Sequence, residues 1–207
     1  LQDAALEAAP DVPVLSLFHE DPVATGLVDS LGRPGRQITG VTSATGPELD
    51  GKRIQFLREL VPAARRIAYV GPRNQFEQFR VVAPPDLTLI PAIVEHRDRY
   101  EAAFAAARDH RPDVVLSSAG PVNYGGFPSI VRWCAEHRLP AVYAAREAVD
   151  GGGLMSYGPS IPQAFRQLAE MTHRILKGER VSEIAVEQPT KFELVVNTRV
   201  AKSLGLA

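Results

Sequence analysis

Residues 151–158 read GGGLMSYG and residues 186–196 read VEQPTKFELVV, and one long amphipathic pattern lies between them. This pattern spaces apolar side chains by helical turns from Phe165 to Leu176, and Gly178 follows where a helix commonly ends. The stretch therefore predicts Gly-rich turns, a short strand, a helix and a polar extended segment that leads into another strand. A chain needs such a series to cross between two lobes, so we expect this stretch to decide the architecture.

The composition is that of a globular protein. Of the 207 residues, 45% are hydrophobic and 23% are charged, which provides enough apolar side chains for a buried core. The formal net charge is −1, and because phosphate binding needs clustered positive charge, no nucleic acid is expected as a partner. The single cysteine, Cys134, excludes an internal disulfide and fits a buried helical face. No apolar stretch approaches the length of a membrane span, and no signal-peptide pattern is visible.

Short apolar runs alternate with helical patterns along the chain. Nearly continuous apolar runs indicate strands that are buried on both faces, as in a parallel sheet covered by helices. Helical spacing identifies several intervening segments, for example the stripe formed by Ile54, Leu57, Leu60 and Val61. The alternation predicts βαβ units and an open parallel α/β sheet. The expected strands are residues 12–18, 38–41, 67–70, 87–94, 114–117, 141–144, 154–157 and 192–196.

No enzyme motif is present in the sequence. The five histidines lack the close spacing of a helical metal site, so no metal is expected. Residues 120–126 read GPVNYGG, which is neither a dinucleotide fingerprint nor a phosphate-binding loop, and no cofactor is expected. Ser117 and Ser118 lie outside any GxSxG motif. We therefore expect no catalytic residue and interpret the chain as a binding protein.

The location of a binding site follows from the predicted topology. Ligands of open parallel sheets bind outside the carboxyl ends of the strands, where helix N-termini offer unpaired N–H groups. Polar residues that directly follow the expected strands are therefore the candidates for ligand contacts. They are Asp21, Thr25, Thr42, Ser43, Asn74, Ser118 and Arg146.

Several of these candidates have a second interpretation. Asp21 precedes Pro22, which also suits a capping residue for a helix over residues 21–31. The hydroxyls of Thr42 and Ser43 either donate to a ligand carboxylate or close a turn. The guanidinium of Arg146 either forks onto a ligand carboxylate or pairs with a carboxylate across the lobes.

Three stretches resemble a known family. They are residues 19–41 (HEDPVATGLVDSLGRPGRQITGV), residues 143–158 (YAAREAVDGGGLMSYG) and the segment 186–196 quoted above. Over nearly its whole length, the chain resembles the substrate-binding proteins of bacterial ABC importers, in the branch associated with tryptophan and tyrosine transport. That family has the two-lobe type I periplasmic-binding fold, with open parallel sheets covered by helices.

The resemblance implies a division of the chain into two lobes. The first lobe would comprise residues 1–46 and 152–180, and the second lobe residues 62–148 and 186–207. The hinge crossings would lie near residues 44–47, 149–153 and 180–189. Relative to the family pattern, about two βα units, on the order of 60 residues, precede the first residue, so the first lobe is expected to be incomplete. The strand at residues 12–18 would then have an unpaired apolar edge, which favours a homodimer through that lobe.

The resemblance also implies a function. It implies a periplasmic or otherwise extracytoplasmic solute-binding protein that closes two lobes on a small ligand and presents the closed form to an ABC permease and its ATPase. An amino acid or a similar small carboxylate is the first ligand to expect. Two alternatives stay open: a periplasmic sensor module that hands its closed form to a receptor, and an α/β enzyme that uses a nucleotide or a flavin.

Overall fold

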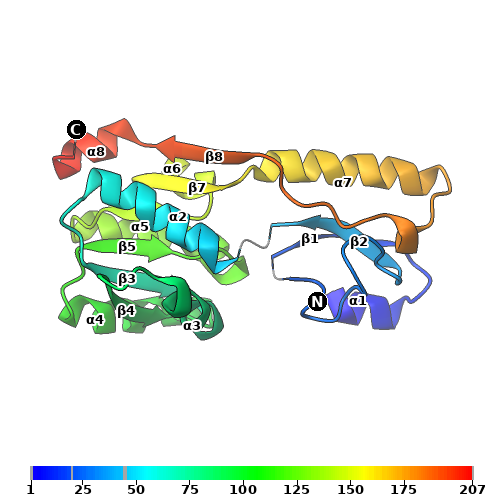
Figure 1. The fold of residues 1–207 in the computed structure, drawn as a ribbon, viewed down its shortest axis with the longest axis horizontal. Helices are drawn as coiled ribbons and strands as arrows, with labels where there is room; N and C mark the ends of the chain where they lie inside the picture. The colour runs from blue at the N-terminus through cyan, green and yellow to red at the C-terminus, as the bar shows by residue number, and fades with distance from the viewer. Residues whose placement is uncertain (1, 20, 44–45, 207) are drawn as a thin grey trace. The chain divides into compact units, whose positions relative to one another are not determined.

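The computed structural model describes residues 2–19, 21–43 and 46–206, with the side chains of all of these except Gln2 and Asp3. The chain divides into two compact units. Unit 1 consists of Leu1–Ala44 and Pro159–Phe192, and unit 2 consists of Thr45–Gly158 and Glu193–Ala207. Both units combine strands with helices (Figure 1). Each expected strand is present within the described residues, with ends that differ by at most two residues.

Unit 2 is built on a six-stranded sheet with the strand order β4-β3-β5-β6-β7-β8. Strand β3 pairs in parallel with β4 and β5, and the pairs β5–β6 and β6–β7 are parallel as well. The predicted parallel α/β sheet is therefore confirmed. The strands are β3 (Arg66–Gly71), β4 (Thr88–Ile93), β5 (Val114–Ser117), β6 (Ala141–Tyr143), β7 (Met155–Pro159) and β8 (Phe192–Val196).

Helices cover both faces of this sheet. Ile67 and Tyr69 of β3 pack with the helices of one face, whereas Ala68 and Val70 pack with those of the other, as the alternation of side chains along a strand requires. The first face carries α2 (Pro47–Leu60), α3 (Arg73–Val82) and α8 (Thr198–Leu204). The second face carries α4 (Tyr100–Asp109), which follows the short helix η1 (Arg97–Arg99), together with α5 (Pro121–Glu136) and α6 (Arg146–Asp150).

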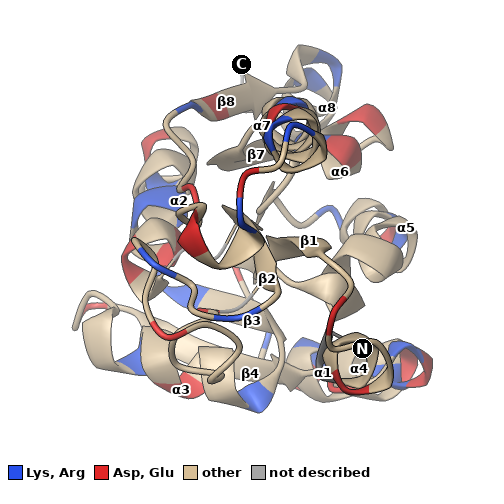
Figure 2. Cartoon of the chain, turned by 90° about the vertical axis from the view of Figure 1, so that its right-hand side faces the viewer, with Lys and Arg blue, Asp and Glu red and all other residues tan. Residues whose placement is uncertain are grey.

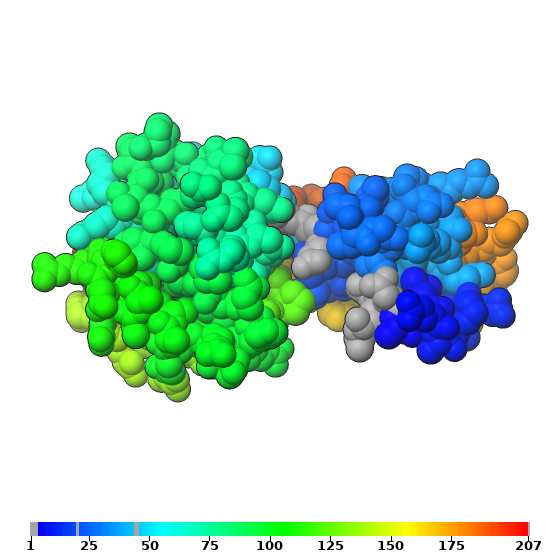
Figure 3. All heavy atoms as spheres, turned by 90° about the horizontal axis from the view of Figure 1, so that it is seen from below, coloured from blue at the N-terminus to red at the C-terminus, as the bar shows by residue number. Residues whose placement is uncertain are grey.

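The core of the second face contains Cys134, which was interpreted as buried, and a stacked aromatic pair. The rings of Phe104 and Trp133 stack with centroids 4.5 Å apart. Cys134 is buried beside them, and burial raises the pKa of its thiol to about 12, so the thiol stays protonated and packs as a small apolar group. The segment from α3 through the edge strand β4 to α4 forms one side of unit 2, which is the teal-to-green surface in Figure 3.

Unit 1 is built on two parallel strands, β1 (Val14–Phe18) and β2 (Ile38–Thr42). The two strands approach closely at Gly40, where an added Cβ would lie 1.8 Å from the Ser16 carbonyl oxygen and where φ is +156°. On its other side β2 is flanked by Glu187, whose backbone N–H donates to the Gly40 carbonyl and whose carbonyl accepts from Thr42. The helices of this unit are α1 (Gln2–Ala8), α7 (Ile161–Leu176) and the short η2 (Val181–Glu183).

Two predictions about unit 1 are wrong. The segment after β1 was expected to form a helix over residues 21–31, but its described residues form successive turns, and two glycines at positive φ, Gly26 and Gly35, suit such a path. Residues 152–158 were assigned to the first lobe. They belong to unit 2 instead, because β7 pairs with β6 through Val142–Met155 and Tyr143–Ser156.

The positions at which the chain passes from one unit to the other therefore differ from two of the expected crossings. The segment 149–153 comprises the end of α6 and the turn that follows it inside unit 2, and the chain leaves that unit after Gly158. Residues 180–189 stay in unit 1, where Ile184 and Val186 join its apolar clusters, and the chain returns to unit 2 after Phe192. Of the first expected crossing, residues 44–47, two positions lie outside the described residues.

Candidate functional site

The carboxyl ends of β3, β4, β5 and β6 meet at one edge of the unit 2 sheet, because these strands are parallel. The candidates Asn74, Ser118 and Arg146 follow three of these strands, so the topology brings them to the same edge. Their environments differ greatly. Asn74 and Arg146 are exposed, whereas Ser118 is completely buried.

Asn74 lies in the first turn of α3. Its side-chain oxygen accepts a hydrogen bond from the backbone N–H of Gln75, at 2.9 Å. The same helix end receives a carboxylate, because Glu95 Oε1 accepts from the backbone N–H of Arg73 at 2.9 Å. A negative charge is favourable at a helix N-terminus. Glu95 was not predicted, although it directly follows the expected strand 87–94 and the rule applied to the other strands would have found it.

Ser118 belongs to a buried hydrogen-bonded group at the end of β5. Asn123, at the start of α5, donates from Nδ2 to the Ser118 hydroxyl at 3.2 Å and to the Val70 carbonyl at 2.8 Å. Tyr100 donates its hydroxyl to Asn123 Oδ1 at 2.9 Å, and burial raises the pKa of Tyr100 to about 12. Asn123 thereby ties the ends of β3 and β5 to the start of α5, which fixes the position of Ser118.

Arg146 is the first residue of α6. Its side chain is 60% exposed, and Nε lies 3.4 Å from the Asp150 carboxylate one turn along the same helix. The partner seen in the structure is therefore local. Such an exposed pair contributes little to stability, because water screens it.

In unit 1, Ser43 joins the ends of β1 and β2. Its backbone N–H donates to the Phe18 carbonyl at 2.7 Å, and its hydroxyl lies 3.1 Å from the same oxygen and 2.9 Å from His19 Nδ1. Thr42, the last residue of β2, is buried. These contacts place a hydroxyl and an imidazole side by side at the carboxyl edge of the unit 1 sheet.

Asp21 and Thr25 lie in the exposed turns that follow β1. Asp21 Oδ1 accepts from the backbone N–H groups of Val23 and Ala24, and the Thr25 hydroxyl donates to the Asp21 carbonyl at 3.1 Å. Asp21 thus has the local hydrogen bonds of a capping residue, although the segment forms turns and not the expected helix.

The sequence analysis missed a buried polar cluster on α2. Arg53 is 1% exposed, its Nη1 pairs with Asp50 Oδ1, and its Nε donates to the Tyr157 carbonyl at 2.7 Å. Tyr69 donates its hydroxyl to Asp50 Oδ2 at 2.9 Å. A signal was available, because Asp50 and Arg53 extend the stripe of Ile54 and Leu57 backward at helical spacing.

This polar cluster connects to Ser118 through Tyr69. Burial is the main reason that the pKa of Tyr69 is raised well above its ordinary value, and the neighbouring Asp50 raises it further, whereas a hydrogen bond from Ser118 acts in the opposite direction. Tyr69 is therefore a protonated donor to Asp50 at neutral pH. Gly71 leaves room for the Ser118 hydroxyl, since a Cβ at that position would lie 2.2 Å from Oγ.

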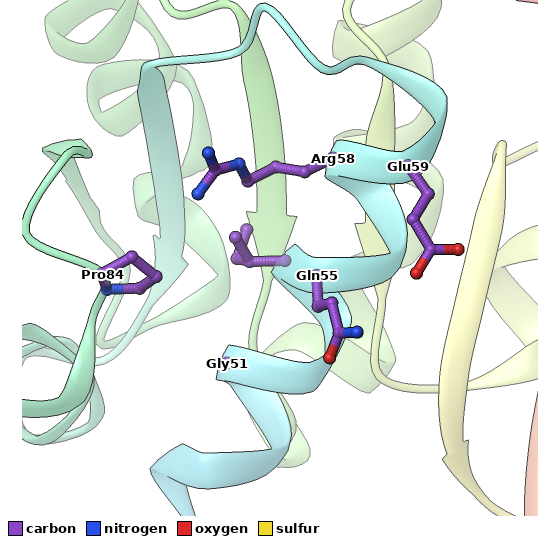
Figure 4. A pocket seen from close by; sticks show the side chains of 6 residues that line it. Gly51, Gln55, Arg58, Glu59 and Pro84 are labelled. Atoms are coloured by element: carbon purple, nitrogen blue, oxygen red, sulfur yellow. The ribbon is translucent and has the colours of Figure 1, made fainter.

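A surface pocket of about 400 Å³ lies elsewhere on unit 2. It is formed by one side of α2 and by the loop that precedes β4, where Pro84 faces Arg58 across the opening (Figure 4). Because this loop leads into β4, the pocket lies toward the amino ends of the strands. Acidic and basic residues are interspersed along α2, as Figure 2 shows. Ligands of parallel sheets bind outside the carboxyl ends of the strands, so we do not assign the ligand site to this pocket.

The described residues contain no group of three His, Cys, Asp or Glu side chains that could hold a metal ion. Within the same residues, no helix is both long enough and apolar enough to cross a membrane.

Comparison with known proteins identifies the family. Residues 3–207 match the family of ABC transporter substrate binding proteins. A curated relative, the tyrosine-binding protein of Clostridioides difficile (strain R20291), is 21% identical over 210 residues, which cover 98% of this chain and 60% of the relative. The chain thus spans about 60% of the length of that relative.

Solved structures show the same fold. One is the ABC domain in complex with L-Trp from Streptococcus pneumoniae, with a TM-score of 0.85 and 23% identity over 100% of this chain and 72% of the other. Another is a conserved domain protein from Vibrio cholerae, with a TM-score of 0.87 and 22% identity over 100% of this chain and 71% of the other.

The two α/β units thus have the fold of these solved structures. The chain belongs to the ABC transporter substrate-binding protein family. The predicted family and fold class are confirmed.

Proposed function

We propose that this protein is the ligand-binding component of an ABC importer and that it binds an amino acid, with tryptophan and tyrosine as the first candidates. Family membership supports the importer role, and the similar proteins that carry tyrosine or L-Trp in their names support the ligand class. The proposal includes an extracytoplasmic location and a permease with its ATPase as partners.

One observation in the structure carries the ligand class. The carboxyl edge of the unit 2 sheet presents groups of both signs, the carboxylate of Glu95 at the start of α3 and the guanidinium groups of Arg53 and Arg146. A free amino acid carries one ammonium and one carboxylate, so an edge with both charges suits it.

The ligand contacts are proposed on the same reasoning. The residues Asp21, Thr25, Thr42, Ser43, Asn74, Ser118 and Arg146 stay the proposed binding set, to which we add Glu95. Within each unit, the buried members, Thr42 and Ser43 in unit 1 and Ser118 in unit 2, would support the exposed ones.

Isothermal titration calorimetry tests the ligand class. L-tryptophan and L-tyrosine are expected to bind with micromolar or lower Kd, and tryptamine, which lacks the carboxylate, to bind at least tenfold more weakly. Absence of heat with every proteinogenic amino acid at millimolar concentration would contradict the proposal.

The proposal also includes closure of two lobes. The backbone near residues 158–159 and 192–193, where the described part of the chain changes unit, would serve as the hinge. A ligand that touches both lobes favours the closed state by its differential affinity. Small-angle scattering is expected to give a smaller radius of gyration with ligand, and identical curves at saturation would contradict closure.

Self-association is proposed through unit 1. Among the described residues β1 has a strand partner, β2, on one side only. Open strand edges pair readily with another chain, and a two-fold contact satisfies both edges at once. Sedimentation velocity at micromolar concentration is expected to show a dimer, and a monomer of 22.5 kDa throughout would contradict this part of the proposal.

A further inference from the structure

The guanidinium of Arg53 is buried with one nitrogen unpaired. Nε and Nη1 have acceptors in the Tyr157 carbonyl and the Asp50 carboxylate, but Nη2 has no hydrogen-bond partner among the described residues. Buried polar groups are nearly always hydrogen-bonded, and leaving one unpaired is costly, above all on a charged group. The unpaired N–H groups therefore call for an acceptor.

The position of Nη2 places that acceptor at the carboxyl edge of the sheet. A Cβ added to Gly158, near the end of β7, would lie 3.6 Å from Nη2 and 1.9 Å from the carbonyl oxygen of Ala144, which follows β6. Glycine thus lets β7 pass close to β6 and leaves no side chain at position 158 beside the guanidinium. This edge is where ligands of parallel sheets bind.

The surrounding contacts hold the guanidinium in one orientation. Asp50 uses one carboxylate oxygen for Arg53 and the other for the Tyr69 hydroxyl, and the Tyr157 carbonyl holds Nε from a different strand. A guanidinium that two neighbouring groups already hold loses little conformational entropy when it also binds a ligand. Arg53 is therefore preorganised, in contrast to the exposed Arg146.

A guanidinium edge binds carboxylate oxygens through charge-assisted hydrogen bonds. We propose that Nη2 of Arg53 binds the carboxylate of the amino-acid ligand, and that Asp50 and Tyr69 are the positioning residues that hold it in place. This inference rests on the proposed function and names the residue that recognises one end of the ligand.

Calorimetry with L-tryptophan and its carboxamide tests the inference. The carboxamide keeps the ring and the ammonium but removes the negative charge. The protein is expected to bind L-tryptophan about 10- to 100-fold more tightly than the carboxamide, which corresponds to the loss of a hydrogen bond between charged groups.

The variant Asp50→Asn/Arg53→Met removes both charges together, so no lone charge stays buried, and it keeps an acceptor for Tyr69. Its affinity for L-tryptophan is expected to fall about 10- to 100-fold while its affinity for the carboxamide is unchanged, so the preference disappears. Arg58→Met is the matched control, because Arg58 lies on the same helix and pairs with Asp86 at the surface. It is expected to keep the full preference.

The outcomes separate the two proposals. If the unchanged protein binds neither probe nor any other proteinogenic amino acid, the proposed function is wrong and the role of Arg53 falls with it; if it binds another amino acid, that amino acid and its carboxamide replace the two probes. If it binds both probes with equal affinity, or if the folded double variant still prefers L-tryptophan, only the inference about Arg53 is wrong. If the double variant does not fold, equal affinity of the unchanged protein for both probes still overturns the inference, and loss of the preference in Arg146→Ala would overturn it as well by assigning the carboxylate to Arg146.

Discussion

Arg53 on helix α2 donates from Nε to the carbonyl oxygen of Tyr157 on strand β7, at a distance of 2.7 Å and at a sequence separation of 104. The bond fixes the last part of β7 before the chain leaves unit 2 after Gly158. The same guanidinium pairs with Asp50, which accepts from Tyr69 on β3. One buried cluster therefore ties a helix to two strands at the edge of the sheet where we place the ligand.

Removal of the Tyr69 hydroxyl is expected to destabilise the protein. Tyr69→Phe leaves a buried carboxylate oxygen of Asp50 without its donor, which costs about 1–3 kcal/mol. Urea unfolding followed by circular dichroism measures this loss. Tyr143→Phe is the control, because the Tyr143 hydroxyl is also buried but its neighbour is the Cys134 thiol, a weak hydrogen-bonding group, and not a carboxylate. The control is expected to change stability by less than about 0.5 kcal/mol, and equal losses in both variants would argue against the cluster.

A methyl group at Gly71 is expected to disturb the end of β3. In Gly71→Ala the Cβ would lie 2.2 Å from Ser118 Oγ and 3.2 Å from the Tyr69 ring, so stability falls by about 1–3 kcal/mol through overpacking. Thermal unfolding measures the change. Gly51→Ala on α2 is the control, because nothing lies within 4 Å of its Cβ, and alanine there raises stability by about 0.5–1 kcal/mol. A neutral Gly71→Ala would mean that Ser118 is not held as described.

Asp113 is expected to govern part of the acid response. Its carboxylate accepts from the side chain of Arg66 and from the backbone N–H groups of Arg65 and Arg66, and the hydrogen bond from the Arg66 side chain is the main reason that its pKa is lowered to about 2. The ionised form is thus favoured in the folded state. Its stabilisation is present above about pH 4 and is lost as the pH falls toward 2.

The variant Asp113→Asn tests this expectation. The difference in unfolding free energy between the protein and the variant should be largest near neutral pH and should shrink between pH 4 and pH 2. A difference that stays constant across this range would show that the charge of Asp113 is not responsible.

Arg146→Ala is expected to weaken the binding of L-tryptophan only slightly, by about 1 kcal/mol or less, because the Arg146 side chain is mostly exposed and its charge is screened. Calorimetry of the variant gives the change directly. A loss of 100-fold would instead make Arg146 the main group for the ligand carboxylate and would displace Arg53 from that role.

The sequence predicted the strands well because each is a short apolar run, and β3, β5 and β6 are buried on both faces of their sheet. It failed where polar side chains are buried. Asp50 and Arg53 lie at helical spacing from the apolar stripe of α2, but charged side chains are usually exposed, so their contacts with Tyr69 and Tyr157 were not predicted. The helix expected after Asp21 did not form because capping residues also suit turns, and local signals do not separate the two.

The division into units was harder to predict for a similar reason. The Gly-rich segment 151–153 has the composition of a hinge, yet Gly153 serves close packing, since a Cβ there would lie 2.6 Å from the Tyr143 ring and 2.8 Å from the Ala148 carbonyl. Glycine that permits motion and glycine that permits close contact are identical in sequence. Only the pairing of β6 with β7 assigns the segment to unit 2.

Native mass spectrometry of the purified protein, with and without L-tryptophan or L-tyrosine, tests the central claim most directly. The account predicts one added amino acid per chain, retained at micromolar concentration and displaced by an excess of the other amino acid. A protein that stays at its own mass with every amino acid offered, while circular dichroism shows it folded, would contradict the claim that this chain is an amino-acid-binding protein.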